Sequence, residues 1–507
     1  MADASWLMAI ALAACAPERP ANTVFYASGA DLQSINPLLT THPLAKQVQR
    51  YVLFTTLVQL DTALRVTPYL ARRWEWSDGN RTLRFDLADG VSWHDGTPTT
   101  ADDVVFTLNA ARDPATGYPR SSELSCVVSV TGRRLSVTLS FCRPMPGIPD
   151  VLTDLAILPF HLLKDVARHE MERAAFNDNP VGNGPYRFVE HVARRRWVFE
   201  RNPAFPEALG GPPSLERLAI VVVDEPTTKL AGLVGGELDF AGIAPMHASV
   251  VARVAGRQVL DYPLLFSYGL VWNTSRRPFD DPRLRRAVTL ALDRRQLIAA
   301  VLYGYAEEAT GPVPASHPLA VTVPQIPFDR AGARALLDSL GYNEARRLSF
   351  TLSTVGSADN VLEQLIQAQL AAVGVDVRIR QLELGAFLAA AQGGARDYDA
   401  LITGIPGDLA LGYFAALFDS RRRQGPLQYA QFASAELDRA LDRGDLAEAQ
   451  RVVAREVPIT FLYHARGVQG VNRRVRGVRM DLRGELASLH DWRLAMGNGQ
   501  WTMGNAQ

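Results

Sequence analysis

The segment spanning residues 83–108 constrains the fold more than any other part of the chain. Its first residues, 83–87, alternate apolar and charged side chains with the two-residue period of a strand that has one buried face. A turn at Asp95-Gly96 follows. Thr100 then occupies a helix N-cap position, and Asp103 lies three residues later, as in a capping box. The segment therefore predicts a strand, a turn and a capped helix in close succession.

Two later segments predict strand, helix and strand in succession. Residues 218–240 combine an apolar strand, a helix from Thr227 to Val234 and a short second strand. Residues 348–379 combine a strand, a helix that ends before Gly374 and an alternating strand. Such units, with largely apolar strands, are typical of the parallel sheets of α/β proteins.

Other local signals lie between these units. Asp281 and Asp329 each occupy the N-cap position of a predicted helix, and Pro282 is a favoured first helical residue. The glycines of residues 181–185 predict a tight turn that leads into a strand. A short strand is predicted over residues 268–271.

Two cysteines bear on the compartment. Cys126 and Cys142 flank a hairpin pattern that turns near Gly132, so their sulfurs could lie on neighbouring strands. A disulfide suits an oxidising compartment. Two buried free thiols fit the pattern equally well, because sequence does not fix the hairpin register and disulfide geometry is strict.

The N-terminal segment predicts export. Residues 6–14 form an apolar run of the length of a signal-peptide h-region, which is too short to span a bilayer as a helix. The run ends in Leu12-Ala13-Ala14-Cys15, which looks like a bacterial lipobox, and this likeness implies that Cys15 is lipidated. Residues 1–21 are therefore interpreted as a signal peptide and tether. The predicted location is the periplasm or the extracytoplasmic cell surface, with a lipid anchor in the membrane.

Length and charge limit the class of function. A chain of 507 residues exceeds the usual size of a single core, so two or three lobes are expected. Lys plus Arg and Asp plus Glu both total 53, which argues against a nucleic-acid partner. The sequence shows no nucleophile elbow, zinc-protease helix or Walker loop, and its nine histidines lack metal-ligand spacing. No enzymatic activity, cofactor or metal is therefore predicted.

Long motifs give the chain a family resemblance. The chain resembles the family 5 extracellular solute-binding proteins of ABC importers, the peptide- and nickel-binding group, in GVSWHDGTPTTADDVVFTL (90–108), PVGNGPYRF (180–188), NTSRRPFDDPRLRRAVTLALDRRQLI (273–298) and QLAAVGVDVRIR (369–380). These motifs occur in the order found in that family. The resemblance implies a receptor that captures a solute, catalyses no reaction, and delivers the solute to a membrane permease with cytoplasmic ATPases.

The same resemblance implies the fold. The expected architecture is α/β, a two-lobed periplasmic-binding-protein type II fold of cluster C, with mixed sheets and an additional inserted domain. The implied boundaries are 22–46, 180–268 and 466–507 for lobe I, 47–179 for the inserted small domain, and 269–465 for the opposing lobe II. Two crossing segments, near Trp272-Asn273 and near residue 465, would form the hinge about which the lobes close on the solute.

The resemblance also implies a solute site. In peptide-binding relatives an aspartate pairs with the ligand's α-ammonium, and Asp408 occupies the matching position, close to Gly404 and Ile405. Trp272 and Tyr413 are candidates for an apolar or stacking surface in the cleft. The alternatives are an ordinary solvated loop aspartate and ordinary core aromatics.

Ligand length and partners are predicted more broadly. The loop of residues 354–357 offers only backbone N–H groups and hydroxyls to a ligand carboxylate, which favours an oligopeptide over a dipeptide. A monomer that works with an ABC permease is expected. Alternatives from other classes are a secreted hydrolase or a signalling receptor on the same fold, or a carrier of nickel, haem or sugar.

Overall fold

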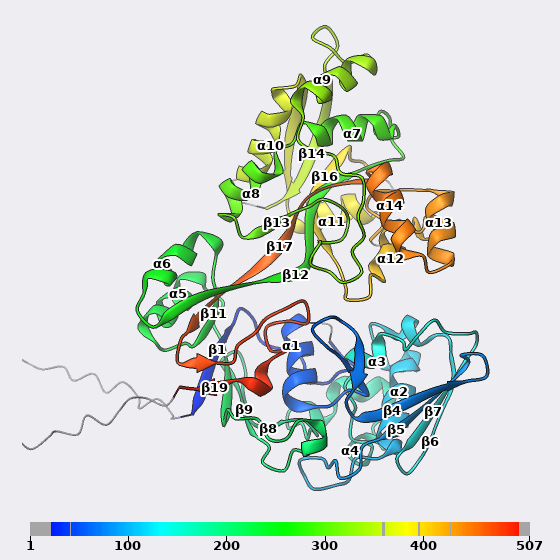
Figure 1. Cartoon of the computed structure of the whole chain (residues 1–507), viewed down its shortest axis with the longest axis vertical. Helices are drawn as coiled ribbons and strands as arrows, with labels where there is room; N and C mark the ends of the chain where they lie inside the picture. Colours follow the sequence, from blue (N-terminus) through cyan, green and yellow to red (C-terminus); the bar gives the residue numbers. More distant parts are fainter. Residues whose placement is uncertain (1–21, 41, 357–359, 394–395, 426, 496–507) are drawn as a thin grey trace, which may run out of the picture.

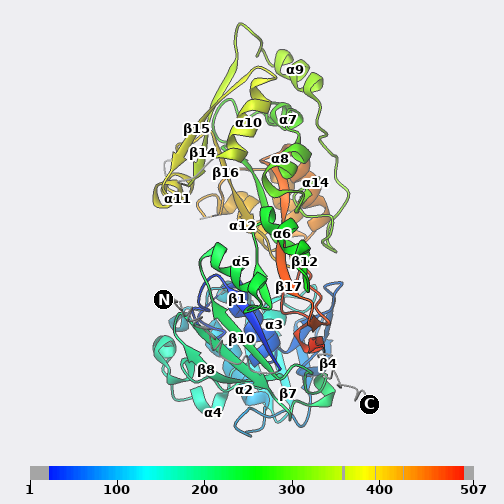
Figure 2. The same cartoon turned by 90° about the vertical axis from the view of Figure 1, so that its left-hand side faces the viewer.

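The computed structural model describes residues 22–40, 42–356, 360–393, 396–425 and 427–495. These residues form an upper and a lower body, and strands β12 (Arg257–Trp272) and β17 (Ile459–Asn472) run side by side from one body to the other (Figures 1 and 2). The predicted signal peptide and Cys15 lie outside the described residues. No helix of the described residues has the length and apolar character needed to cross a membrane.

One mixed sheet of eleven strands extends through both bodies. Its order is β15-β14-β16-β12-β17-β11-β1-β10-β9-β8, and β13 pairs with β17 off this path. Besides β12 and β17, it comprises β1 (Thr23–Ser28), β8 (Tyr186–Val192), β9 (Arg196–Arg201), β10 (Arg217–Val222), β11 (Phe240–Gly242), β13 (Ala306–Glu308), β14 (Leu348–Val355), β15 (Val375–Leu382) and β16 (Ala400–Pro406). The two bodies therefore share one hydrogen-bonded layer.

Both predicted strand-helix-strand units are confirmed. Strands β10 and β11 pair in parallel with β1, which lies between them, and α5 (Pro226–Gly235) connects them. Strands β14 and β15 pair directly in parallel and are connected by α10 (Val361–Ala371). Because β16 is also parallel to β14, the carboxyl ends of these three strands lie at one edge of the sheet.

Strand β12 is much longer than the strand predicted at 268–271. It begins at Arg257 and pairs with β17 on both sides of a register shift between Pro263 and Ser267. The predicted lobe boundaries at 268/269 and 465/466 fall within these two strands. The extra length depends on pairing with a strand about two hundred residues away, which a local pattern does not reveal.

A second, antiparallel sheet lies in the lower body. Its order is β4-β5-β7-β6, formed by β4 (Ala71–Ser77), β5 (Thr82–Leu87), β7 (Ser136–Phe141) and β6 (Val127–Arg133). Helix α2 (Ala101–Arg112) follows β5, and its predicted capping box is confirmed. The Thr100 hydroxyl accepts a hydrogen bond from the Asp102 N–H, and the Asp103 carboxylate accepts one from the Thr100 N–H at 2.7 Å.

The hairpin of β6 and β7 differs from the prediction at its turn. The chain reverses at residues 134–135, not near Gly132. A Cβ added to Gly132 would lie 2.8 Å from the Ala101 Cβ, so this glycine lets α2 approach the sheet. At the open end of the hairpin, Cys126 and Cys142 form a disulfide with a Cα–Cα distance of 5.1 Å.

The glycines of residues 181–185 serve a close backbone approach, and neither has the positive φ of a glycine-dependent turn. A Cβ on Gly182 would lie 1.8 Å from the Leu53 carbonyl oxygen, and one on Gly184 would lie 2.6 Å from the Leu53 carbonyl carbon. His94 joins the same contact. Its Nδ1 accepts from the Gly182 N–H at 3.2 Å, and its Nε2–H donates to the Gly184 carbonyl at 3.0 Å.

Helices cover the sheets of both bodies. Those of the upper body are α7 (Pro282–Leu290), α8 (Arg294–Leu302), α9 (Arg330–Ser339), α10, α11 (Leu384–Gln392), α12 (Tyr413–Phe418), α13 (Ala435–Asp442) and α14 (Leu446–Glu456). Those of the lower body include α1 (Pro43–Val48), α2, α3 (Val151–Asp154), α4 (Phe160–Leu163), α5 and α6 (Ala248–Arg253). The predicted N-caps are confirmed, because Asp281 accepts from the Arg283 N–H and Asp329 from the Gly332 N–H.

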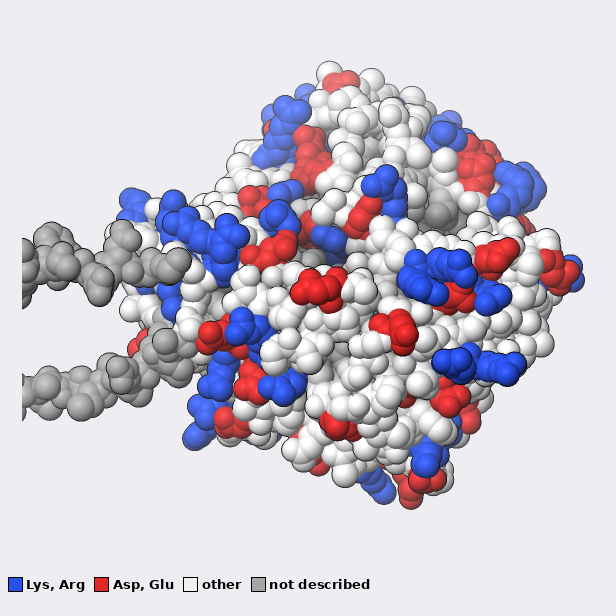
Figure 3. Space-filling view, turned by 60° about the horizontal axis from the view of Figure 1, so that its bottom comes forward, with Lys and Arg blue, Asp and Glu red and all other residues white. Residues whose placement is uncertain are grey.

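The apolar core follows the same division. One buried cluster runs through the lower body and joins both of its sheets, and two more clusters fill the upper body. The surface in Figure 3 intersperses basic and acidic side chains, without a field of one sign. This distribution agrees with the net charge of zero.

Candidate functional site

The candidate site begins where β16 ends. Asp408 follows this strand and precedes α12, which lies at the lower side of the upper body and faces α3 of the lower body (Figure 1). Ligands of open α/β sheets bind beyond the carboxyl ends of parallel strands, which is the edge that β14, β15 and β16 share. The position of Asp408 therefore matches that of a ligand-binding side chain.

The Asp408 carboxylate also organises its own loop. One oxygen accepts from the N–H groups of Ala410 and Gly412, and the other accepts from that of Tyr413, all at 2.9 Å. The side chain is half-buried. Four lone-pair directions are available on a carboxylate, so three loop contacts leave one for a further donor.

Asp150 brings a second carboxylate to the site from the lower body. It immediately precedes α3, and its carboxylate makes no hydrogen bond that caps this helix. Partial burial, the negative charge of Asp408 and that of Glu123 raise the pKa of Asp150 to about 6, although the positive charge of Arg120 lowers it. The charge of Asp408 thus acts across the two bodies, and an ammonium group between the two carboxylates would relieve their repulsion.

We call Asp150 and Asp408 the facing carboxylates. Sequence reasoning identified Asp408 but missed Asp150. A lone aspartate that follows Ile148-Pro149 carries no local signal of ligand binding, because its partner lies far away in the sequence.

Gly404 shapes the apolar side of the site. It lies opposite Tyr268 in the β12–β16 pairing, and an added Cβ would lie 2.0 Å from the Phe266 ring. The ring therefore lies over the strand at Gly404, and 41% of Phe266 remains exposed. Sequence reasoning missed Phe266, although a glycine within a strand is a signal that another group approaches closely.

Trp272 and Ile405, which were predicted as site residues, are core residues and do not line the candidate site. Trp272 has no exposed surface, packs on Phe279 at a ring distance of 4.8 Å, and donates to the Thr460 hydroxyl at 2.9 Å. Ile405 is 1% exposed within an upper-body core cluster. Both side chains point into the core from neighbouring strands. An apolar residue type is equally compatible with a core position and with a cleft surface, so the sequence did not separate the two.

Tyr413 stays beside the site. Its hydroxyl donates to the Pro312 carbonyl at 3.2 Å, and its ring is half-buried. Burial and the nearby charge of Asp408 raise its pKa. The side chain thus connects the Asp408 loop to the segment that contains Pro312.

A buried ion cluster supports the lower wall. Asp154 of α3 contacts Lys46 at 3.0 Å, Arg50 at 2.9 Å and Arg120 at 2.7 Å. These cations hold the pKa of Asp154 below its usual range in spite of its burial. The cluster fixes α3, and with it Asp150, against α1.

The described residues contain no group of three or more His, Cys, Asp or Glu side chains arranged to hold a metal ion.

Two bodies that share two long strands, with opposed carboxylates where they face each other, define a two-lobed binding protein. The sequence places it more narrowly. Residues 65–422 match the family described as Bacterial extracellular solute-binding proteins, family 5 Middle, and the chain belongs to this family. The resemblance noted in its motifs is thereby confirmed.

The similarity to individual relatives extends over nearly the whole chain. The chain is 25% identical to the oligopeptide-binding protein AppA of Bacillus subtilis over 96% of its own length and 97% of that protein. The structure of CtaP from Listeria monocytogenes superposes with a TM-score of 0.82 at 21% identity, covering 93% of this chain and 99% of that one. NikZ from Campylobacter jejuni, in complex with Ni(L-His), gives 0.76 at 21% identity, covering 94% and 100%. These structures confirm the predicted fold class.

Proposed function

We propose that this protein is the peptide-binding component of an ABC importer. The solute would bind between lobe I with its inserted domain and lobe II, with the boundaries implied by the sequence, and β12 and β17 would act as the hinge. The similarity to AppA, an oligopeptide-binding protein, supports this ligand class. A permease with cytoplasmic ATPases would receive the peptide.

The observation that carries the proposal is the pair of facing carboxylates beside exposed Phe266. The charge of Asp408 raises the pKa of Asp150, so a cation would be favoured between the two carboxylates, and the α-ammonium of a peptide supplies it. Phe266 offers an apolar surface for a peptide side chain. Asp150, Asp408, Gly404, Phe266 and Tyr413 would form this part of the cleft.

Asp150→Asn tests the proposal, because no described residue donates a hydrogen bond to the Asp150 carboxylate. We expect it to weaken the binding of an unblocked tetrapeptide by about 2–4 kcal/mol, measured by isothermal titration calorimetry. The N-acetylated peptide lacks the ammonium group and should bind the variant and the unaltered protein equally.

Asp338→Asn is the matched control, since Asp338 is exposed on α9 at the far end of the upper body (Figure 1). If the unblocked peptide binds the Asp150→Asn variant with unchanged affinity, the proposed contact between Asp150 and the ammonium group is wrong. Thermal unfolding of each variant checks that the fold is intact.

The proposal excludes catalysis, so incubation with peptide should return the peptide intact. Hydrolysis that is lost in one polar variant without loss of binding would favour the secreted hydrolase instead. A rise in melting temperature with nickel, haem or sugar, and with no peptide, would keep a transport role and reassign the solute.

We further propose that the protein acts outside the cytoplasmic membrane as a lipid-anchored monomer. The family of extracellular solute-binding proteins supports the compartment. The apolar run that ends in Leu12-Ala13-Ala14-Cys15 supports lipidation of Cys15. The disulfide between Cys126 and Cys142 fits an oxidising environment.

A further inference from the structure

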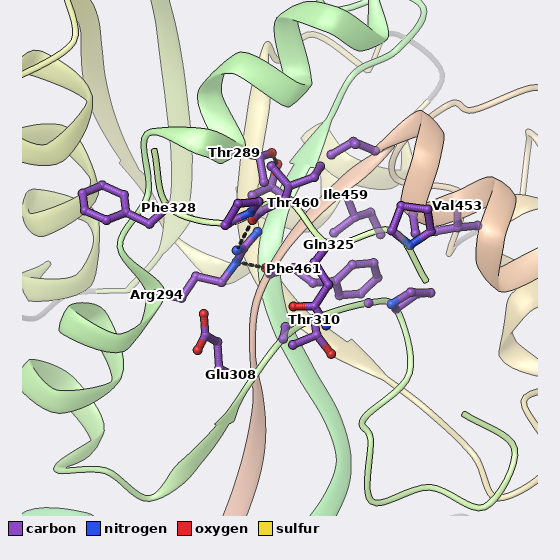
Figure 4. A pocket seen from close by; sticks show the side chains of 18 of the residues that line it. Thr289, Arg294, Glu308, Thr310, Gln325, Phe328, Val453, Ile459, Thr460 and Phe461 are labelled. Carbon is purple, nitrogen blue, oxygen red and sulfur yellow. Dashed lines mark hydrogen bonds between the residues drawn. The ribbon is translucent and has the colours of Figure 1, made fainter. Parts of the chain in front are cut away.

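The upper body contains a second cavity away from the facing carboxylates. Its volume is about 440 Å³, and it lies among α7, α8, α14, β17 and the segments 308–312 and 324–328 (Figure 4). This volume falls within the range of roughly 300–1,000 Å³ typical of small-molecule sites. Pro312 of the cavity accepts the hydrogen bond from the Tyr413 hydroxyl, but none of the residues proposed for the peptide site lines the cavity itself.

Arg294 provides the positive charge of the cavity. Only 8% of the residue is exposed, and no described carboxylate forms an ion pair with it. Its Nε–H donates to the Phe461 carbonyl at 2.9 Å, and Nη1 donates to the Ile326 carbonyl at 3.0 Å (Figure 4). The Nη2 group has no acceptor among the described residues, so a buried guanidinium retains unused donors.

Two carboxylates line the cavity: Asp293, whose Oδ1 accepts from the Gln296 N–H at the start of α8, and Glu308. The Glu308 carboxylate lies next to Arg294 at the same end of the cavity (Figure 4). Oε2 accepts from Nε of Arg295 at 2.8 Å, but no described residue donates to Oε1. Arg295 is 86% exposed at its side chain, so solvent screens this pair and leaves the carboxylate available.

The remaining wall is mixed, because Thr310 and Gln325 line the cavity together with apolar side chains. Val453, Ile459 and Phe461 line the cavity on the side away from Glu308 (Figure 4). Thr289 and Thr460 satisfy each other, since their hydroxyls lie 2.7 Å apart. The cavity therefore offers unused cation donors, an unused anion acceptor beside them, and an apolar surface.

We propose that this cavity binds a free α-amino acid with an apolar side chain. The ligand carboxylate would accept from Nη2 of Arg294, and its ammonium would donate to Oε1 of Glu308. Its side chain would pack on Ile459 and Phe461. A ligand with only a carboxylate would be repelled by Glu308, and a ligand with only an ammonium group would be repelled by Arg294. The charge pattern therefore selects a zwitterion.

Calorimetric titration of the full chain with L-leucine tests this site. We expect binding at millimolar or lower concentration. Glu308→Gln should weaken it about tenfold or more, whereas Glu344→Gln, on an exposed residue after α9, should not change it. N-acetyl-leucine and 3-methylbutylamine, which each lack one charge, should bind at least about tenfold more weakly than leucine.

Asp150→Asn separates this cavity from the proposed peptide site. Leucine binding that survives Asp150→Asn and is weakened by Glu308→Gln supports the cavity. Leucine binding that is lost in Asp150→Asn and kept in Glu308→Gln would place the amino acid at the facing carboxylates and overturn the inference. Absence of leucine binding, or equal binding of N-acetyl-leucine, would overturn it as well.

Discussion

At the scale of single residues, His94, which lies within the family motif of residues 90–108, serves the fold. Its ring connects the loop of residues 181–185 to the start of the turn before α2, through one accepted and one donated hydrogen bond. That pattern requires a neutral ring with the proton on Nε2. Burial lowers the pKa of His94 to about 4, so the ring stays neutral at moderately acidic pH.

The neutral ring predicts a loss of stability in acid. The unfolded chain binds a proton near pH 6.5, whereas the folded chain binds it only near pH 4, so stability falls as pH decreases across this interval. Linkage gives a loss of about 3 kcal/mol. His464, whose pKa burial also lowers to about 4, contributes in the same direction.

Urea denaturation at pH 7 and pH 4.5 measures this effect. We expect His94→Gln, which keeps an acceptor and a donor, to reduce the difference in stability between the two pH values. His169→Gln, on an exposed histidine, should leave that difference unchanged. An equal difference in all three proteins would show that His94 does not titrate as described.

At the scale of elements, the contact between residues 181–185 and η1 (Gln49–Leu53, one turn of π-helix) joins two parts of the lower body by direct approach of their backbones. The Gly184 N–H donates to the Leu53 carbonyl at 2.9 Å, and the Thr55 N–H donates to the Asn183 side chain at 2.9 Å. Only glycine permits backbones to lie this close.

Gly182→Ala should therefore destabilise the protein by about 3 kcal/mol, because the new Cβ would meet the Leu53 carbonyl oxygen. Gly147→Ala is the control, since a Cβ there meets nothing within 4 Å. Thermal and urea unfolding measure both variants. Equal stability of the two would mean that η1 can move away at little cost.

Elements whose signals are local could be predicted from the sequence. The capping box at Thr100 and the N-caps at Asp281 and Asp329 depend on residues within one turn, and all three are confirmed. The ion cluster around Asp154 could not be predicted, because Lys46 and Arg120 approach it from distant parts of the chain. Phe266 and Asp150 were not predicted as site residues for the same reason. The complete burial of Trp272 likewise depends on tertiary packing.

At the scale of the whole molecule, β12 and β17 make the connection between the bodies a part of the sheet. Their mutual pairing is interrupted between Pro263 and Ser267, where the register shifts and each strand pairs with a different neighbour, β12 with β16 and β17 with β13. Closure should bend the sheet at this interruption, because the hydrogen bonds on either side resist deformation.

Small-angle X-ray scattering tests this closure. Saturation with an unblocked peptide should lower the radius of gyration of the full chain, because the closed state buries the peptide between the bodies. The N-acetylated peptide, which lacks the ammonium group, should lower it less at the same concentration. A radius that does not change with a bound peptide would contradict closure.

The place of β1 in the sheet has a consequence for synthesis. This strand, near the start of the chain, lies between β10 and β11, and β11 in turn pairs with β17. More than four hundred residues separate β1 from β17. At translation rates of about 5–20 residues per second, β11, which pairs with β1 on one side, waits roughly 10 to 45 s for β17 to cover its other edge. The nascent lower body therefore stays incomplete, with open strand edges, until almost the entire polypeptide has left the ribosome.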